Sequence, residues 1–431
     1  MSNKSFKGLR IGNYRITPLG LATLGVLALL IIGGIVLAVA KPFGGGNDAA
    51  VTAANATAAP AEALPGALPG ADAPTSVPTR EPDPRSATIR SLGEIAMQQN
   101  LLLSAVSENT FTFDGMFADI SSVIGNADYT VADVEGSLGG TAEYSGTAKM
   151  VTPPSLIGTL KNCGVDMLML ANDHALDGGW TDLQAAIRNC QNEGMAYVGA
   201  AASAEERATP VIKDINGIKV AFLAYTETLN GNEKNEDPAA VQYGVNLIAK
   251  SNAKQDIDSA RAAGADVVVC YVSWGEMMNY NATDSEKQIA QALCNWGADV
   301  IIGYNPHVIQ PAGWLESTDA SGNIHRTLCL GATGNLLSDQ YGNYDSGIIF
   351  QFTIQEVEYG HFAITNPVYI PTYVWRSEGE NGKFNYRSLA IGQWLEKEPE
   401  GMAYADAARM RELWATIQKW MGSSVATCAA E

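Results

Sequence analysis

The sequence contains few histidines, comparatively few basic side chains and no cysteine pair spaced for metal binding. Only 4 histidines occur in 431 residues, and the 6 cysteines include no C-x-x-C pair. Lys and Arg total 27 against 46 Asp and Glu, so the net charge is −19 at pH 7. Because neutralising nucleic-acid phosphates needs clustered basic residues, this balance excludes nucleic acid as a partner.

The cysteines are interpreted as small buried hydrophobic residues. Cys270 and Cys329 lie inside apolar runs of strand length. Cys163, Cys190 and Cys294 lie near the ends of helical patterns. One disulfide in an exported protein is the alternative to six free thiols. Nothing in these positions indicates cysteine catalysis.

A long hydrophobic run lies near the N-terminus. Residues 19–40 are all Gly, Ala, Thr, Leu, Ile or Val, which is the length that a helix needs to cross a bilayer. The four charged residues before it are all basic: Lys4, Lys7, Arg10 and Arg15. We therefore predict a basic cytoplasmic tail over 1–17, a single-pass signal anchor over 18–40 and an acidic body outside the cytoplasm. A signal peptide cleaved after Ala38-Val39-Ala40 is the alternative.

The segment over 41–86 is rich in Ala, Pro and Gly and shows no apolar periodicity. Such a composition buries too little apolar surface to offset the entropy of ordering, so we predict a disordered linker. The folded body is expected to begin near Ala87.

Beyond the linker, apolar runs of strand length alternate with helical patterns. Strands are predicted over 129–132, 167–170, 220–224, 267–272, 300–302 and 348–352. Helices are predicted over 155–162, 181–193, 252–263 and 285–296. This alternation predicts a layered α/β fold. The main domain is expected over 87–375, followed over 376–431 by a C-terminal extension whose amphipathic helix, 403–420, packs on the body.

Polar side chains, most of them of types that bind metal ions, follow four of the predicted strands. In chain order they are Asp133 and Glu135; Asn172, Asp173 and His174; Ser273 and Trp274; and Asn305 and His307. In α/β sheets, functional loops follow the carboxyl ends of strands, so we expect these residues to form one polar site. Asp133 and Glu135 would share one face if their strand continued through them.

The order and spacing of these segments resemble the poly-gamma-glutamate capsule biosynthesis CapA family, whose domain is related to the calcineurin-like metallophosphatases. The matching segments are 133–136, 171–179, 273–275, 303–308 and 332–336. The resemblance spans roughly residues 91–373. It implies an α/β sandwich of the metallophosphatase type and a role in synthesis, release or anchoring of an anionic cell-surface polymer, acting on that polymer or with its synthesis machinery.

Several motif positions differ from the family pattern. The resemblance places Glu94 where the family has its first aspartate. Asp133 and Asp173 stand where the family has Asn, while Ser273 and Asn305 stand where it has His. Two nitrogen ligands are therefore absent. The unchanged polar positions are Glu135, Asn172, His174, Asp177, His307 and Asn335.

The resemblance implies that His174 is the acid of a metal-assisted hydrolysis. The implied metal ligands are Glu94, Asp133, Glu135, Asp173 and His307, an oxygen-rich set that favours Mn²⁺, Mg²⁺ or Ca²⁺ over Zn²⁺. Asn172, Asp177, Ser273, Trp274, Asn305 and Asn335 are the other expected site residues.

A metal-free binding groove is the alternative to this hydrolase. Carboxylates would then crowd one cleft and raise the pKa of at least one of them. The chain would in that case be a catalytically inactive scaffold or polymer-binding module. Two single positions also have alternatives to a site role. Asp173 could cap the turn that follows it, and Trp274 could be a packed core residue.

Overall fold

The structure, a computed structural model, describes residues 10–11, 14–15, 83–319, 321–379 and 382–429. The chain divides into two units, Met1–Thr79 and Arg80–Glu431. In the first unit, β1 (Arg10–Ile11) pairs antiparallel with β2 (Tyr14–Arg15). The predicted anchor over 18–40 lies outside the described residues, as does the predicted linker as far as residue 82. Among the residues that the structure describes, no helix is both long and apolar enough to span a bilayer.

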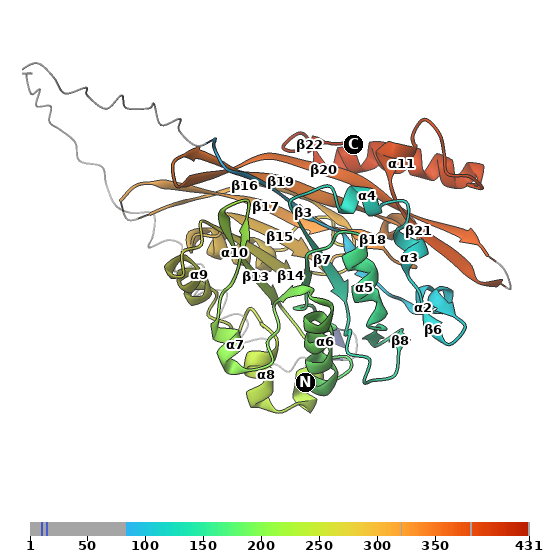
Figure 1. Cartoon of the computed structure of the whole chain (residues 1–431), viewed down its shortest axis with the longest axis horizontal. Coiled ribbons are helices and arrows are strands. Elements are labelled where there is room, and N and C mark those ends of the chain that lie inside the picture. Colours follow the sequence, from blue (N-terminus) through green and yellow to red (C-terminus); the bar gives the residue numbers. More distant parts are fainter. Residues whose placement is uncertain (1–9, 12–13, 16–82, 320, 380–381, 430–431) are drawn as a thin grey trace, which may run out of the picture. The chain divides into compact units, whose positions relative to one another are not determined.

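The larger sheet of the second unit has ten strands (Figure 1). Seven of them lie in the order β11 (Ala196–Val198), β10 (Met167–Met169), β7 (Tyr129–Glu135), β3 (Ser86–Ser91), β19 (Ser346–Glu358), β20 (His361–Glu378) and β21 (Phe384–Ala390). The other three are β4 (Glu94–Ala96), which pairs with β7, β18 (Asn335–Leu337), which pairs with β4, and β22 (Ala426–Thr427), which pairs with β20. From β11 to β3 the strands are parallel, whereas β19 runs antiparallel to β3.

The smaller sheet has six strands. Their order is β12 (Val211–Ile215), β13 (Ile218–Thr226), β14 (Val267–Ser273), β15 (Val300–Tyr304), β17 (Ile324–Thr333) and β16 (Ile309–Thr318). The four inner strands are parallel, and both outer strands are antiparallel to their neighbours. Side chains of β14 alternate between two cores: Val269 and Tyr271 face the first sheet, while Val268 and Cys270 face the helix layer. That layer consists of α9 (Ala253–Ala262) and α10 (Asp284–Asn295).

A row of aromatic residues joins the two sheets. Phe222, Tyr271 and Tyr304 come from three neighbouring strands, with ring centroids 6.5 Å and 6.1 Å apart. The first sheet meets this row at the Tyr129 ring, whose centroid lies 5.2 Å from that of Phe222. At the other end, the Tyr304 hydroxyl donates a 3.1 Å hydrogen bond to the carbonyl oxygen of Leu92. The sandwich is therefore fixed by polar contacts as well as by apolar packing.

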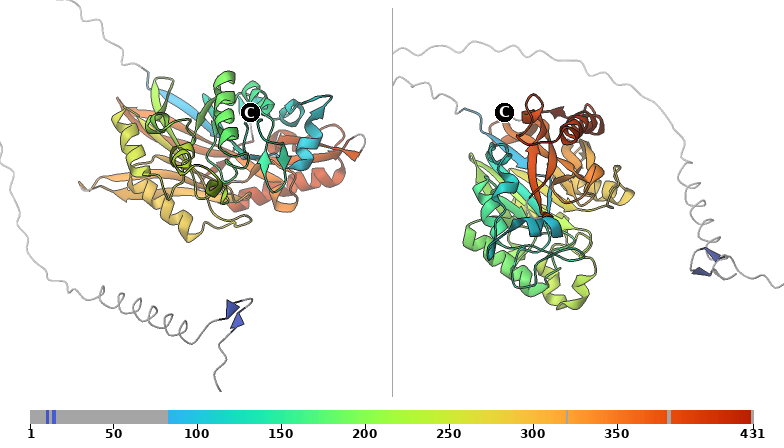
Figure 2. Two further views of the ribbon diagram at one scale, coloured as in Figure 1. Left: turned by 90° about the horizontal axis from the view of Figure 1, so that it is seen from below. Right: turned by 90° about the vertical axis from the view of Figure 1, so that its right-hand side faces the viewer.

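Helices cover the outer faces of the sandwich. The predicted helices appear as α5 (Ser155–Asn162), α6 (Trp180–Glu193), α9 and α10, and the last amphipathic pattern as α11 (Tyr404–Met421). The shorter elements are α2 (Gln99–Ala105), α3 (Asp114–Phe117), α4 (Ser121–Ile124), α7 (Ala204–Ala208), α8 (Pro238–Gly244), η1 (Asn232–Asn235), η2 (Gly342–Tyr344), η4 (Ile391–Trp394), β5 (Val106–Ser107), β6 (Thr110–Phe111), β8 (Ser145–Gly146) and β9 (Met150–Val151). As predicted, α11 packs on the body; it buries Met410, Leu413 and Ile417 and contacts β16 and β20. Figure 2 shows α11 on the opposite side of this unit from α6 and α8.

The layered α/β architecture predicted from the sequence is confirmed. Strands β16, β20 and β21 were not predicted, and β17 was indicated only by the apolar run around Cys329. Each of these strands is buried along only part of its length, so the apolar pattern does not cover the whole strand. Strand β20 runs through residue 375, so the expected boundary between residues 375 and 376 falls within a strand. Strand β21 continues the same sheet beyond it.

Replacing Tyr304 by Phe should destabilise the sandwich. The substitution removes the hydroxyl and leaves the buried Leu92 carbonyl without its donor, which costs about 1–3 kcal/mol of unfolding free energy. Urea unfolding followed by circular dichroism measures this loss. The matched control is Tyr404→Phe, because Tyr404 is 87% exposed and should tolerate the change. Equal stability of the two variants would contradict the prediction.

Candidate metal centre at the carboxyl ends of the strands

The predicted site residues converge from both sheets. Strand β7 continues through Asp133 and Glu135, so these two carboxylates share one face of the strand as expected. The loop after β10 supplies Asp173 and His174, and the loop after β15 supplies His307. The cluster thus lies where parallel strands end.

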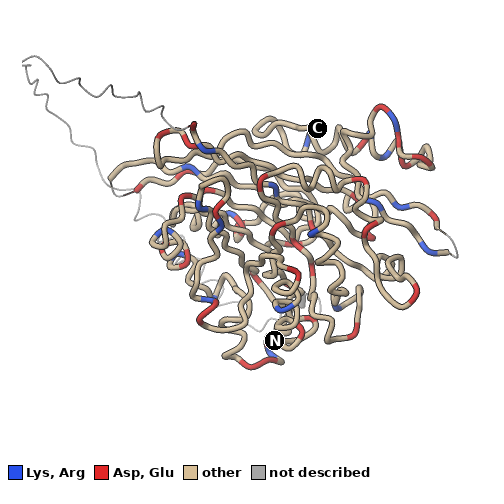
Figure 3. The backbone as a smooth tube through the Cα atoms, in the orientation of Figure 1, with Lys and Arg blue, Asp and Glu red and all other residues tan. Residues whose placement is uncertain are grey.

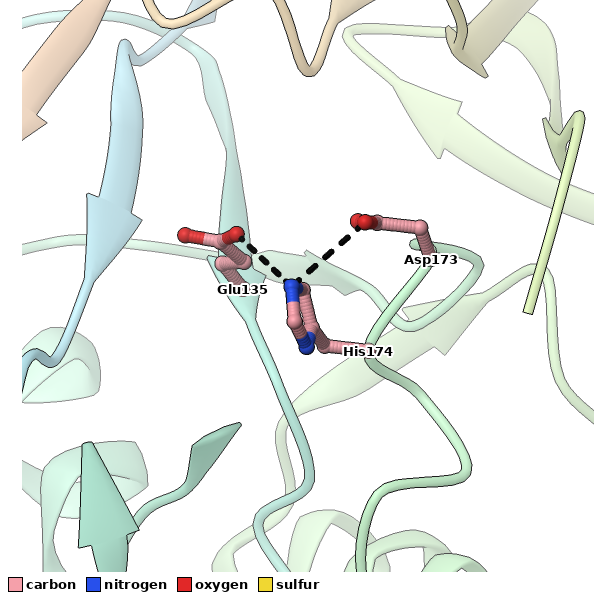
Figure 4. Close-up of side chains that lie close together, drawn as sticks. All are labelled: Glu135, Asp173 and His174. Atoms are coloured by element: carbon pink, nitrogen blue, oxygen red, sulfur yellow. Dashed lines mark ion pairs between the residues drawn. The ribbon is translucent and has the colours of Figure 1, made fainter. Parts of the chain in front are cut away.

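Three side chains come together closely enough to hold a metal ion. Ligand atoms of Glu135, Asp173 and His174 lie within 4.8 Å of one another. His174 Nε2 lies 3.4 Å from Glu135 Oε1 and 3.5 Å from Asp173 Oδ2 (Figure 4). Within the described part of the chain this is the single group of three such residues. His174, expected from the resemblance to act as an acid, thus also belongs to a candidate ligand group.

Asp177 holds the ring of His174. Its Oδ2 lies 2.6 Å from His174 Nδ1 and accepts a 2.6 Å hydrogen bond from the backbone N–H of Met150. Its Oδ1 accepts from Asn232 Nδ2 at 2.7 Å. Burial by itself would lower the pKa of His174, but the surrounding carboxylates of Asp177, Asp173 and Glu135 outweigh burial and raise this pKa to about 9.

His307 is buried between partners from three strands. Its Nδ1 lies 2.9 Å from Glu94 Oε2 and 3.0 Å from Asn335 Oδ1, and its Nε2 lies 3.5 Å from Glu135 Oε1. Burial opposes protonation, yet the charges of Glu94 and Glu135 raise the pKa of His307 well above its usual range. The position assigned to Glu94 by the resemblance therefore does face His307.

The approach of Glu94 depends on a glycine. A side chain at Gly93 would place its Cβ 2.7 Å from the backbone nitrogen of Leu336 and 2.9 Å from the carbonyl oxygen of Gly334. The backbone N–H of Glu94 donates to that carbonyl at 2.8 Å. Only glycine lets β4 lie this close to β18, where Asn335 resides.

Asp133 is the most deeply buried carboxylate of the site. Its Oδ1 is buried and has no hydrogen-bond partner among the residues that the structure describes. Burial, followed by the charges of Glu94, Glu135 and Asp173, raises its pKa well above the ordinary value. Burial also raises the pKa of Asp173, whereas the two nearby imidazoles outweigh burial at Glu135 and lower its pKa.

Some expected site residues support the loops and do not face the carboxylates. Asn172 ties β7 to the next loop, since its Oδ1 accepts from the N–H groups of Gly136 and His174 and its Nδ2 donates to the Val134 carbonyl. Asn335 similarly donates through Nδ2 to the Tyr344 carbonyl at 3.0 Å.

The residues around 274 do not form ligands in this arrangement. Trp274 is a buried core residue whose indole donates to the Gly331 carbonyl at 2.9 Å, which confirms the packed-core alternative. Asn305 donates through Nδ2 to the carbonyls of Trp274 and Gly275, both at 3.0 Å. Ser273 ends β14 and is buried beside them.

Two residues of the site were missed in the sequence. Asn230 donates to Asp173 Oδ2 at 2.9 Å, and Asn232 donates to Asp177. Both follow β13, a predicted strand whose carboxyl end was not included among the four site loops. The polar run over residues 226–236, directly at the end of β13, could have indicated these two residues in the sequence.

The donor set fits a hard divalent cation. Four carboxylates, from Glu94, Asp133, Glu135 and Asp173, meet the imidazoles of His174 and His307. Asp177 Oδ2 also lies 2.6 Å from His174 Nδ1, so with all seven groups charged the sum is −5 + 2 = −3, most of which one divalent cation would offset. The charge of His307 offsets only part of the cost of burying Asp133, whose Oδ1 has no hydrogen-bond partner among the described residues.

Comparison of the sequence with known protein families identifies the family to which the chain belongs. Residues 88–340 match the family described as bacterial capsule synthesis protein PGA_cap, and the chain therefore belongs to this family. The capsule biosynthesis protein CapA of Bacillus anthracis is 25% identical over 240 residues, which cover 54% of this chain and 57% of that protein. The PGA biosynthesis protein CapA of Bacillus subtilis (strain 168) is 24% identical over 264 residues, which cover 58% of this chain and 64% of that protein. The matched region is thus less than two thirds of either relative.

Solved structures show a looser likeness. The calcineurin-like phosphoesterase YfkN from Bacillus subtilis aligns with 78% of this chain and 99% of that chain, with 12% identity and a TM-score of 0.41. Haemophilus influenzae NAD nucleotidase (NadN) aligns with 81% of this chain and 65% of that chain, with 9% identity and a TM-score of 0.42. Values this low support no inference about the chemistry of this chain.

Replacing Asp177 by Asn should lower the pKa of His174 in the metal-free protein. The wild-type imidazole should titrate near a pKa of about 9. Because this folded-state pKa lies above the unfolded value of about 6.5, protonation of His174 stabilises the fold fully below about pH 6.5. The stabilisation is lost as the pH rises through the folded-state pKa. NMR titration of the ring in EDTA measures the shift. Asp128→Asn, at the opposite end of β7, is the control, and an unchanged His174 titration in Asp177→Asn would contradict the assignment.

Proposed function

We propose that the chain is a metal-dependent hydrolase that acts on a cell-surface polymer. The convergence of Glu135, Asp173 and His174 carries this proposal. The oxygen-rich surroundings favour Mn²⁺, Mg²⁺ or Ca²⁺ over Zn²⁺. Such an ion supplies Lewis-acid polarisation of the bond to be cleaved.

Each side chain has a distinct part in this proposal. Glu135 and Asp173 would hold the cation, with Asp133 behind them. Asp177 fixes Nδ1 of His174, so Nε2 is left to face the two carboxylates and to donate a proton to the leaving group. His307 holds Glu94 and Glu135 in place from the second sheet.

An anionic polymer is the substrate class that family membership supports, and a cation would be needed for contact with it. The unit carries acidic residues throughout, with fewer basic ones (Figure 3). Anionic chains are repelled by such a surface unless a cation mediates the contact. The relatives named above are capsule and PGA biosynthesis proteins, which supports the same class of process for this chain.

A catalytically inactive binding module is the second candidate. The specific observation in its favour is the engagement of His307 with Glu94, Asn335 and Glu135, together with the use of Asn305 as a donor to backbone carbonyls. In this case the chain would recognise the polymer or its synthesis machinery without cleaving it.

Mn²⁺ should stabilise the wild-type protein and not the ligand variants. A cation that binds only the folded state, at 100 times its dissociation constant, adds about 2.7 kcal/mol to the unfolding free energy. Calorimetric melting with and without Mn²⁺, together with elemental analysis, measures this in the wild type, Glu135→Gln and Asp173→Asn. Glu358→Gln, on the exposed end of β19, is the matched control and should behave as the wild type.

Turnover separates the two candidates. Assays of phosphodiester and γ-glutamyl hydrolysis with added Mn²⁺ or Mg²⁺ should show activity that His174→Ala reduces by about 10²-fold or more, as expected for loss of a general acid. A protein that contains no metal and whose melting temperature changes with neither Mn²⁺ nor Mg²⁺ would contradict the hydrolase proposal. A protein that the metal ion stabilises but that hydrolyses neither substrate would support the binding module.

The full chain should fractionate with membranes and expose its body outside the cytoplasm, because the predicted anchor at 18–40 follows a basic tail. Protease added to intact spheroplasts should digest the body, whereas a cytoplasmic control protein should survive. Recovery of the body in the soluble exported fraction, without residues 1–40, would instead support the cleaved signal peptide.

A further inference from the structure

A polar pocket lies beside the candidate metal centre. Its volume is about 750 Å³, within the usual range for small-ligand sites. Its walls come from the loop over 142–151, the loop over 176–179 and the segment over 232–236. Asp177 and Asn232 belong both to this pocket and to the surroundings of His174. A ligand in the pocket would therefore contact Asp177, the residue that holds the His174 ring, and would be separated from the imidazole by that one side chain.

One aromatic side chain stands in the wall of this pocket, which we name the Tyr144 pocket. Tyr144 is 38% exposed. Phe111 packs against it edge-on, with centroids 5.3 Å apart and an interplanar angle of 81°. This contact holds the Tyr144 ring in place, and a fixed aromatic plane can stack on the apolar face of a sugar ring.

The polar lining favours a neutral ligand over an anionic one. Its charged residues are Glu143, Asp177 and Glu236 against Lys149, which sum to −3 + 1 = −2. The remaining polar side chains are amides and hydroxyls, from Gln99, Ser145, Thr147, Asn232 and Asn235. Carboxylates accept, and amides both donate and accept, the hydrogen bonds that sugar hydroxyls and acetamido groups make. A polyanion would meet a wall of its own sign.

One wall of the pocket, the one that begins at Ala142, is held by hydrogen bonds to Asp182. Asp182, at the start of α6, accepts from the N–H groups of Thr141 and Ala142 at 2.7 Å and 3.0 Å and from the Thr141 hydroxyl at 2.7 Å. It also accepts from Ser137 Oγ and from the Gly139 N–H. These bonds outweigh burial and lower the pKa of Asp182, which keeps it ionised. Pre-organised walls reduce the entropy that a ligand must lose on binding.

We infer that the Tyr144 pocket binds a neutral saccharide segment beside the metal centre. The inference rests on the proposed function, because it names the part of the polymer or acceptor that lies next to the bond being cleaved. Tyr144 stacks on a sugar ring, while Glu143 and Glu236 accept from its hydroxyls. The cation contacts the charged part of the polymer, and the Tyr144 pocket contacts the uncharged part of the polymer.

The test uses the full chain in EDTA, so that binding is measured without any cation. Tetra-N-acetylchitotetraose and maltotetraose serve as neutral probes, and a γ-linked glutamate oligomer serves as the anionic probe, with saturation-transfer NMR and calorimetry as readouts. At least one neutral probe should bind more tightly than the anionic one. Tyr144→Ala should weaken this binding by about tenfold, whereas Tyr144→Phe should retain it.

Two further variants keep the test decisive. Glu236→Gln should weaken the neutral probe several-fold, because an ionised acceptor makes stronger hydrogen bonds than an amide. Tyr404→Ala, on the exposed face of α11, should leave binding unchanged. Melting curves confirm that each variant is folded. Absence of binding by both neutral probes, tighter binding of the anionic probe, or indifference to Tyr144→Ala would each overturn the inference.

A failure of the saccharide inference can be distinguished from a failure of the proposed hydrolase function. Glu135→Gln should lose the effect of Mn²⁺ and still bind the neutral probe. Saccharide binding in a protein that ignores metal would overturn only the hydrolase proposal. Metal-dependent turnover in a protein whose Tyr144 variants bind as the wild type would overturn only the saccharide pocket.

Discussion

The candidate centre depends on the hydrogen bond between the Tyr304 hydroxyl and the Leu92 carbonyl. Tyr304 ends a strand of the small sheet, and Leu92 lies between β3 and β4 of the large one. Asn305 directly follows Tyr304, and Glu94 is separated from Leu92 only by Gly93; the Asn305 N–H donates to the Glu94 carboxylate. Because the two sheets are fixed at this point, Glu94 and His307 can meet although they are far apart in the sequence.

The same arrangement concentrates negative charge where water is scarce. Burying a carboxylate without compensation costs several kcal/mol, and the raised pKa of Asp133 is the sign of that cost. The two imidazoles compensate only part of it, since each already faces more than one carboxylate. The excess of acidic residues counted in the sequence thus includes a local excess inside the fold, at the place where a cation would restore the balance. Elsewhere in the described unit most acidic residues lie at the surface.

The sequence predicted the position of the centre better than the part each residue plays. The apolar period marks where strands end, and parallel strands end together, so Asp133, Glu135 and His174 could be brought to one site. Periodicity does not reveal how a loop turns after its strand. Asn305 was therefore expected among the other site residues but bonds to backbone carbonyls, and Asn232 was overlooked although it bonds to Asp177. These details depend on contacts between segments that are distant in the chain.

The central position of β3 has a consequence for how the protein folds. This first strand of the body pairs with β7 on one side and, more than 250 residues later in the chain, with β19 on the other. The helix α11 then contacts a strand from each sheet, and β22 pairs with β20 near the end of the described chain. Pairings over such long separations slow folding, because the entropy of closing the loop must be lost before the contact forms. The body is thus expected to complete its fold only after almost the whole of residues 86–358 is available for pairing.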